Sequence, residues 1–260
     1  MLTALTRAPA PTLVNCELTH LERKPIDFRR ASEQHRRYCV ALAACGAQVV
    51  TLTSDADHPD SVFVEDAAVI FDEIAVLAAP GAESRRAEVE RIKPEIARLR
   101  PTARIIPPAT LDGGDVLRIS KTVYVGLSSR TNAAGVEALR RIVAPYGYEV
   151  VAVPVADCLH LKTACTALDG GAILANPEWV DLSFFDGYKV MTVAPGEAWA
   201  ANVLQVGPTL LMSADCPKTM QLVERRGYRV RPVDISEFAK AEAGLTCMSL
   251  VFKSPPQINA

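Results

Sequence analysis

A short phrase that recurs along the chain limits the folds that this sequence can adopt. Gly-Tyr-x-Val begins at Gly147, Gly187 and Gly227, and a looser copy begins at Gly46. A weaker fifth match covers residues 103–107. Together these phrases predict strands that start near residues 47, 104, 148, 188 and 228. A spacing of about 40 to 55 residues is typical of repeat architectures, in which each repeat is one supersecondary unit.

The segments between the predicted strands indicate that the repeated unit is strand, hairpin, helix. Two segments, 114–125 and 201–212, show the apolar–turn–apolar pattern of hairpins. Segment 61–70 reads as an apolar strand or hairpin. Helix-like stretches precede four of the predicted strands, at 28–45, 83–100, 132–145 and 216–226.

Five units of this kind can close into a ring, which leaves no exposed sheet edge. The predicted fold is therefore an α/β, five-bladed propeller of strand-hairpin-helix units with a central active site. The first strand, over 2–14, precedes the first full unit and is expected to complete the last blade. No internal linker interrupts the pattern, so a single domain over residues 1–260 is expected. An ordinary open α/β sheet is the alternative.

Composition and charge exclude several classes of function. The formal net charge is −2 and the 28 Lys and Arg residues are scattered, so no nucleic-acid surface is expected. No apolar run approaches the roughly 20 residues that span a bilayer, and residues 1–7 lack the pattern of a signal peptide. Seven cysteines without a CxxC spacing indicate reduced thiols in the cytoplasm. Four histidines without zinc-site spacing argue against a structural metal.

Residues with catalytic chemistry follow the predicted strands at equivalent positions. Unit by unit, they are Asp60, Glu65 and Asp66; Asp112 and Asp115; His160; Asn202; and Cys247. Equivalent positions in a ring of repeats face one axis, so a cysteine, a histidine and several carboxylates are expected to converge there. That set matches an activated thiol, with a nucleophile, a base within hydrogen-bond reach and an acid that orients the base. Cys247 itself is expected in the middle of a short apolar strand over 243–252.

Each of these residues, taken alone, also has a structural explanation. His160 lies between two leucines and would suit a hydrophobic core, and Asp112 in a Gly-Gly turn would use local backbone bonds. A buried cysteine is commonly a small core hydrophobe. Glu65 and Asp66 differ, because two adjacent carboxylates within an apolar strand are costly to bury without a cation. The shared position of these residues in the repeat favours the catalytic interpretation.

Two arginines indicate the charge of the ligand. Arg85 lies in a loop that begins a helix, and Arg130 lies at another helix start, with Asn132 as a candidate N-cap. The helix dipole disfavours cations at an N-terminus, and a bound anion would remove that conflict. Arg holds carboxylates in a bidentate way. Carboxylates for a cation and arginines for a carboxylate fit an amino acid with a cationic side chain, whereas solvated surface arginines are the alternative.

Six motifs, in this order, resemble those of the dimethylarginine dimethylaminohydrolases, which belong to the guanidino-group-modifying (pentein) superfamily. They are Asp60-Ser-Val-Phe-Val-Glu-Asp66, Pro80-Gly-Ala-Glu-Ser-Arg-Arg86, Leu111-Asp-Gly-Gly-Asp-Val-Leu117, Ser129-Arg-Thr-Asn132, Leu159-His-Leu-Lys162 and Leu245-Thr-Cys-Met-Ser249. The resemblance spans nearly the whole chain. It implies a five-bladed α/β propeller with the active site on the central axis.

The resemblance also implies a role for each matching residue. Cys247 would be the nucleophile, His160 the general acid and base, and Asp112 the acidic third member. The substrate-binding residues would be Glu65 and Asp66 at the guanidinium, Arg85 and Arg130 at the α-carboxylate, Asp60 at the α-amino group, and Leu18 and Ala241 through their backbones.

The implied reaction is cysteine-dependent hydrolysis of asymmetric dimethylarginine or monomethylarginine. It would give citrulline and dimethylamine or methylamine through a covalent thiouronium intermediate, and it needs no cofactor. Lys162 stands where arginine deiminases carry an aspartate two residues after the histidine, on a strand that faces the substrate. The absence of that carboxylate would leave room for methyl groups, so the pocket is expected to favour a substituted guanidine.

The expected partner is thus a small methylated arginine, with no nucleic acid and no membrane, and the protein is expected to be a monomer or homodimer. Zinc bound by Cys247 and His160 would inhibit rather than assist. Three other functions stay open on the sequence alone. They are hydrolysis or amidino transfer on arginine or another guanidine, a non-catalytic pentein-like binding module, and an unrelated α/β protein with a buried cysteine.

Overall fold

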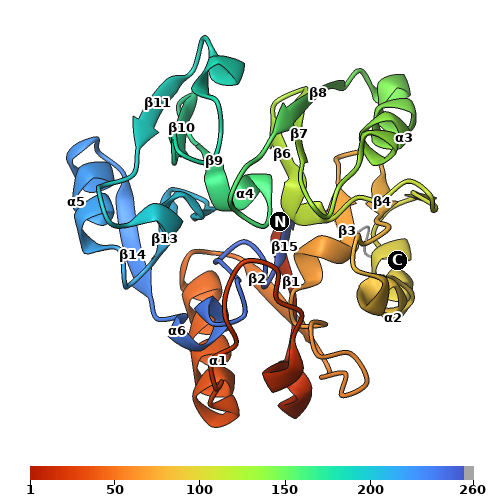
Figure 1. Ribbon diagram of the computed structural model, residues 1–260, viewed down its shortest axis with the longest axis horizontal. Helices are drawn as coiled ribbons and strands as arrows, with labels where there is room; N and C mark the ends of the chain where they lie inside the picture. Colours follow the sequence, from red (N-terminus) through yellow and green to blue (C-terminus); the bar gives the residue numbers. More distant parts are fainter. Residues whose placement is uncertain (255–260) are drawn as a thin grey trace.

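In the computed structural model, which describes residues 1–254, five three-stranded sheets surround a central axis (Figure 1). In each sheet the middle strand is antiparallel to the inner strand and parallel to the outer strand. From inner to outer strand, the sheets are β3 (Ala68–Ile70), β4 (Ala75–Leu77) and β5 (Thr102–Arg104); β6 (Val116–Ile119), β7 (Thr122–Leu127) and β8 (Glu149–Pro154); β9 (Cys165–Leu168), β10 (Ala172–Ala175) and β11 (Lys189–Thr192); β12 (Leu204–Val206), β13 (Thr209–Ser213) and β14 (Arg229–Val233); and β15 (Leu250–Lys253), β1 (Leu2–Arg7) and β2 (Gln48–Leu52). The predicted five-bladed propeller is confirmed, and the last six positions of the predicted domain lie outside the described residues.

The five strands predicted from the recurring phrase are the outer strands of the blades. Gly46, Gly147, Gly187 and Gly227 each stand two residues before an outer strand, with φ between +76° and +95°. Side chains are strained in this left-handed region, so glycine is the residue that lets the chain turn from a helix end into a strand. The phrase therefore begins with glycine because the turn requires it.

The longer helices lie at the periphery and connect middle strands to outer strands, whereas the one-turn helices α4 (Leu161–Ala164) and α6 (Ser236–Ala239) precede inner strands (Figure 1). Parallel neighbours need such a crossover. It is made by α1 (Phe28–Ala44), α2 (Arg86–Ala97), α3 (Ala133–Val143) and α5 (Pro217–Arg225), and in the third sheet by the 3-10 helix η6 (Leu182–Phe185). The predicted helix over 83–100 is shorter than expected, because a separate 3-10 turn, η3 (Glu83–Arg85), precedes it. Across residues 1–254, no helix combines the length and the apolar character needed to cross a membrane.

The first and last strands of the chain close the ring within one sheet. β1 pairs with β15 in antiparallel register, from Leu2 opposite Lys253 to Leu5 opposite Leu250. The expected contribution of the N-terminal strand to the last blade is confirmed, but the strand ends at Arg7 rather than continuing to residue 14. Pro11 begins the 3-10 helix η1 (Pro11–Asn15), and proline lacks the N–H that a strand would use.

Two predicted strands are also shorter than expected, and the difference shapes the site. Glu65 and Asp66 lie in the 3-10 helix η2 (Val64–Ala67), and the strand begins only at Ala68. Neighbouring side chains on a strand point to opposite faces, whereas in this turn both carboxylates reach polar partners. Cys247 likewise lies in the loop before β15, not within a strand.

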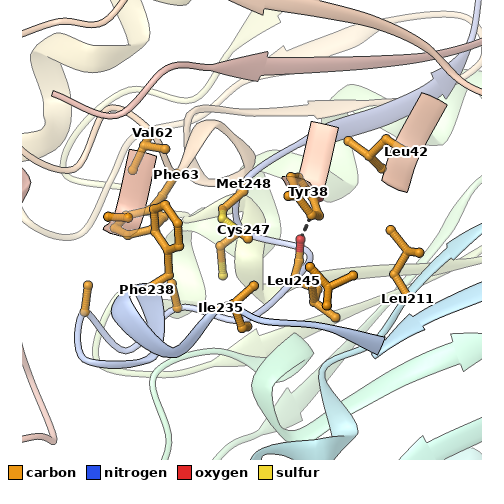
Figure 2. Packing of buried hydrophobic residues seen from close by; sticks show 14 of the residues in the cluster. Tyr38, Leu42, Val62, Phe63, Leu211, Ile235, Phe238, Leu245, Cys247 and Met248 are labelled. Carbon is orange, nitrogen blue, oxygen red and sulfur yellow. Dashed lines mark hydrogen bonds between the residues drawn. The ribbon is translucent and has the colours of Figure 1, made fainter. Parts of the chain in front are cut away.

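The 245–249 loop packs on a hydrophobic cluster beneath α1. Figure 2 shows Cys247 among buried side chains that include Phe63, Phe238 and Met248. Tyr38 of α1 lies fully buried in this cluster, and its hydroxyl donates to the Leu245 carbonyl oxygen at 2.8 Å. A peripheral helix thus supports the segment that carries the candidate nucleophile.

Candidate active site

The segments that precede the five inner strands bring the predicted residues together. Those segments carry Glu65 and Asp66, Asp112, His160, Asn202 and Cys247. Seven of the ten predicted site residues line one pocket: Asp60, Asp66, Arg85, Arg130, His160, Ala241 and Cys247. The expected convergence on one site therefore holds for these residues. Leu18, Glu65 and Asp112 do not line the pocket, and each has a different position.

Cys247 is buried and lines this pocket. Its sulfur accepts a hydrogen bond from the Gly244 N–H at 3.4 Å, and its carbonyl oxygen accepts one from the Glu65 N–H at 3.2 Å. Burial raises the pKa of the Cys247 thiol, and the nearby Glu65 and Asp66 carboxylates raise it further. The sulfur is therefore a protonated thiol when the pocket holds no cation.

His160 is joined to Asp112 by a direct hydrogen bond. It stands at the N-terminal boundary of a one-turn helix, α4 (Leu161–Ala164), and its Nε2 lies 3.0 Å from Asp112 Oδ2. Asp112 is fully buried and does not touch the pocket. Its other oxygen accepts from the Gly81 N–H at 2.9 Å, and its own N–H donates to Thr131 Oγ1. The carboxylate is thus fixed from two sides and orients the imidazole.

The second imidazole nitrogen faces a second carboxylate. His160 Nδ1 lies 3.9 Å from Asp66 Oδ1. Burial alone would lower the pKa of His160, but Asp66, the hydrogen-bonded Asp112 and Asp115 outweigh it and raise that pKa to about 9. The ring is an imidazolium at neutral pH and holds a proton ready to donate.

Asp115, which the sequence grouped with Asp112, has a supporting position. Its carboxylate accepts from the Leu161 N–H at 2.9 Å and from the hydroxyls of Ser128 and Thr131 at 2.6 Å. These bonds anchor the first residue of α4, directly after His160. Burial raises the pKa of Asp115 to about 6 against the opposing effect of His160.

Arg85 and Arg130 both line the pocket, but their guanidinium groups differ in how many hydrogen bonds and ion pairs they already make. Arg85 binds Asp66 at 2.7 Å and Glu88 at 2.9 Å, and it also donates to two backbone carbonyls. Arg130 donates to Thr19 Oγ1 at 2.9 Å through Nη2, and no other guanidinium bond is found for it within residues 1–254. Burial would raise the pKa of Asp66, but His160 and Arg85 outweigh it and hold that pKa at about 2.

Glu65 points away from the pocket that contains Cys247. Its carboxylate binds Lys162 Nζ on one oxygen and Thr246 Oγ1, at 2.7 Å, on the other. Glu65, Lys162 and Thr246 line a different cavity of about 280 Å³, which the inner strands surround on the axis. The expectation that residue 162 lies on a strand and faces the substrate is wrong, because α4 turns its side chain toward Glu65.

Three predicted residues remain, of which Asp60 and Ala241 line the pocket and Leu18 does not. The Asp60 carboxylate is buried and accepts from the Glu17 N–H at 3.0 Å. Leu18, one residue further on, is half-buried against the cluster beneath α1. Ala241 lines the pocket next to Glu242, whose carboxylate accepts the backbone N–H groups of three consecutive residues, 19–21.

The sequence alone missed Glu88 and Glu242. Glu88 sits on α2 and shares Arg85 with Asp66, and Glu242 holds the rim segment in place. Neither residue stands at the repeat-equivalent position that identified the others. The one local signal, an acidic residue three positions after Arg85 in a helix, is also the ordinary spacing of a surface ion pair.

Three ligand atoms, from Asp66, Asp112 and His160, lie within 4.8 Å of one another in this site. The described residues that meet this spacing do not include Cys247. The imidazolium between the two carboxylates accounts for their proximity, and zinc at Cys247 and His160 stays a prediction.

Comparison with known proteins identifies relatives of this chain. A family model described as N,N dimethylarginine dimethylhydrolase, eukaryotic, matches residues 19–165. A dimethylarginine dimethylaminohydrolase of Streptomyces coelicolor is 45% identical over 95% of both chains. One of Pseudomonas aeruginosa is 37% identical over 95% of this chain and 98% of its own.

Solved structures extend the likeness to three dimensions. A cysteine-to-serine mutant of the Pseudomonas aeruginosa enzyme, complexed with citrulline, superposes with a TM-score of 0.93 and 36% identity, covering 96% of this chain and 98% of its own. A cyanobacterial arginine dihydrolase domain, 20% identical with a TM-score of 0.89 and covering 98% of this chain and 99% of its own, shares the fold.

The propeller and its axial site thus define a pentein of the guanidino-group-modifying superfamily. Within that superfamily, the chain belongs to the dimethylarginine dimethylaminohydrolase family. It is accordingly a hydrolase that acts on carbon–nitrogen bonds.

Proposed function

We propose that this hydrolase converts asymmetric dimethylarginine or monomethylarginine to citrulline and dimethylamine or methylamine, with Cys247 as the nucleophile. The observation that carries the proposal is that Cys247 and His160 line one pocket with Asp66, while Asp112 orients the imidazole from behind. A relative of this family is known in complex with citrulline, and another structure holds an adduct with S-methyl-L-thiocitrulline.

The resting charges support activation by the substrate itself. With a protonated thiol and an imidazolium, the empty pocket contains no ready nucleophile. A guanidinium bound beside Asp66 brings a positive charge next to the sulfur and favours loss of the thiol proton to solvent, since His160 already carries its own proton. The thiolate then attacks the central carbon of the guanidinium. The Asp66 carboxylate keeps the guanidinium protonated, which makes this carbon electrophilic.

The proton on His160 serves the next step. It passes to the nitrogen that carries the methyl groups, the carbon–nitrogen bond breaks, and the amine leaves. A positively charged thiouronium remains on Cys247. Neutral His160 takes a proton from a water molecule, whose oxygen attacks the same carbon. The carbon–sulfur bond then breaks, which returns the thiolate and releases citrulline. The second proton of that water then restores the Cys247 thiol, and the proton that the thiol lost at the start is taken up by the released amine in solution.

The contacts favour a division of the binding roles. We assign the guanidinium to Asp66, because Glu65 is held by Lys162 and Thr246 outside the pocket. We assign the α-carboxylate chiefly to Arg130, because Arg85 is shared by Asp66 and Glu88. Arg85 then acts by fixing Asp66, and Asp60 stays the proposed partner of the α-amino group, at the rim beside the backbones of Leu18 and Ala241.

All seven cysteines are free thiols. A free thiol is what the proposed chemistry requires, and it is the ordinary state in a reducing compartment. This supports the cytoplasm as the proposed location.

A substrate panel tests the proposal. Purified protein is incubated with asymmetric dimethylarginine, monomethylarginine and arginine, and citrulline release is measured for each. We expect turnover of the methylated substrates, loss of it in Cys247→Ser, and retention of it in Cys216→Ser, which alters another buried cysteine. Faster citrulline release from arginine than from the methylated substrates would indicate that the protein hydrolyses arginine instead. Turnover by Cys247→Ser would remove Cys247 as the nucleophile.

A further inference from the structure

Asn202 connects the two loops that carry the proposed catalytic pair, although it comes from a different blade. It is buried after the 3-10 helix η7 (Ala198–Ala201), just before β12. It does not line the pocket of Cys247 and His160. Asn202 occupies the same position in the repeat as Cys247 and His160, yet it has no role in the reaction described above.

The amide of Asn202 makes three hydrogen bonds, all to the catalytic loops. Nδ2 donates to the Lys162 carbonyl oxygen at 2.8 Å and to Thr246 Oγ1 at 3.1 Å. Oδ1 accepts from the Thr246 N–H at 3.1 Å. Lys162 is two residues after His160, and Thr246 directly precedes Cys247. One planar amide therefore fixes the distance between the two segments.

The same amide sets the direction of a longer chain of hydrogen bonds. Thr246 Oγ1 accepts from Asn202 and, in turn, donates to Glu65 Oε2. Glu65 also binds Lys162, and its N–H donates to the Cys247 carbonyl oxygen. The amide of residue 202 donates to Thr246 Oγ1 and accepts from the Thr246 N–H at once, because it carries both an NH2 group and a carbonyl oxygen. An Asp there would present a second carboxylate near Glu65 and lose both donors.

The backbone of the turn before Cys247 packs closely against the side chain of Asn202. A Cβ atom added to Gly244 would lie 2.3 Å from Asn202 Cγ and Oδ1. Glycine at residue 244 is thus required by the side chain of Asn202. The N–H of this glycine is also the group that donates to the Cys247 sulfur. Asn202 consequently contacts the turn at two positions that precede Cys247, Gly244 and Thr246.

We propose that Asn202 is a positioning residue for the reaction. By binding both loops, Asn202 holds the Cys247 sulfur at a fixed position relative to His160. This inference rests on the proposed role of Cys247 as the nucleophile. Asn202 touches neither the substrate nor the reacting atoms. Its loss should therefore lower the rate of sulfur attack more than it weakens substrate binding.

The chain offers a matched control for the loss of a buried asparagine. Asn176, in the preceding blade, is equally buried, and its amide accepts from the Glu178 N–H and donates to the Ala198 carbonyl oxygen. Its side-chain amide bonds to neither catalytic loop, and the bond from its backbone N–H to the Ala164 carbonyl oxygen is kept in Asn176→Ala. A general loss of packing or stability would appear in both Asn176→Ala and Asn202→Ala, whereas loss of positioning would appear only in the latter.

The experiment measures kcat and KM with asymmetric dimethylarginine, and the rate at which 2-chloroacetamidine alkylates Cys247, followed by intact mass. In Asn202→Ala, we expect kcat and the alkylation rate to fall about 10- to 100-fold with little change in KM, because small misplacements of a reacting atom have effects of that size. Asn176→Ala should keep both rates near those of the wild-type protein. Gly244→Ala should reproduce the loss, and the double variant with Asn202→Ala should lose little more.

Unchanged kcat and alkylation in a folded Asn202→Ala would overturn the inference, as would an equal loss in Asn176→Ala. If Asn202→Ala fails to fold, Gly244→Ala decides, because it disturbs the same contact and leaves the amide intact. Turnover by Cys247→Ser would instead remove the proposed nucleophile, so the two failures are distinguishable.

Discussion

At the scale of single residues, the site is governed by buried charge. His160 lies between Asp66 and Asp112, and these carboxylates keep its proton at a pH where an ordinary histidine would have lost it. A buried cation of this kind stabilises the folded protein only while it is protonated. The protonation state that the proposed leaving-group step needs is thus also linked to stability.

We expect the free energy of unfolding to fall as the pH rises toward 9 and beyond. The pKa of His160 is about 9 in the folded protein, against an ordinary 6.5. A raised folded-state pKa gives a contribution that is fully present below pH 6.5 and is lost as the pH rises through 9. It amounts to roughly 3 kcal/mol. Urea unfolding across this range measures it.

The matched variant for this measurement is His160→Asn, which should show a shallower fall between pH 6.5 and 9. The contribution of His35 to the free energy of unfolding has the opposite dependence on pH, because burial lowers the pKa of His35 to about 4. Its contribution is present above pH 6.5 and is lost as the pH falls. Identical pH dependence of the wild type and His160→Asn above pH 6.5 would contradict the charge state assigned to His160.

At the scale of secondary-structure elements, the recurring phrase predicted the outer strands because its glycine is demanded by local backbone geometry. Local rules could not place Glu65 and Asp66, whose turn depends on partners 19 to 181 residues away in the chain. The same limit applies to Arg85. Its motif suggested an anionic ligand, whereas in the fold Asp66 and Glu88 neutralise it.

The proposed catalytic residues could be grouped from the sequence because they occupy one position in a repeat. Asp112, His160 and Cys247 each lie in the segment before an inner strand. Glu242 and Glu88 fall outside that position and were not predicted. Repeat symmetry thus identifies the residues on the axis, and tertiary packing decides which of them face the pocket.

We expect Tyr38→Phe to destabilise the protein by about 1–2 kcal/mol, since it leaves two buried groups short of a partner. The hydroxyl of Tyr38 bonds the Leu245 carbonyl oxygen and Ser249 Oγ, on both sides of Cys247. Chemical unfolding measures the loss. Tyr146→Phe, at an exposed tyrosine, is the control and should change little. Equal stability of the two variants would show that α1 does not anchor the loop.

At the scale of the whole molecule, the ring is closed by pairing of the two ends of the chain in the sheet β15–β1–β2. We propose that the five blades form one folding unit over residues 1–260. Removing a core side chain from β1 should then weaken every blade, including those on which it makes no contact.

Leu5→Ala tests that proposal, because Leu5 is buried in β1 opposite Leu250. We expect a loss of about 2–5 kcal/mol. The protein has two tryptophans, Trp179 and Trp199, whose rings stack edge to face in other blades. Their fluorescence and the far-ultraviolet circular dichroism should shift together. A tryptophan transition that does not move would indicate separately folding parts.

In the proposed reaction, the substrate carbon becomes bonded to Cys247 during turnover. The direct measurement is intact and peptide mass spectrometry of the enzyme, quenched in acid while it turns over asymmetric dimethylarginine. We predict a thiouronium adduct on the peptide that contains Cys247, seen in the wild-type protein and missing in Cys247→Ser. Steady turnover with no adduct on Cys247, or with an adduct on another residue, would contradict it.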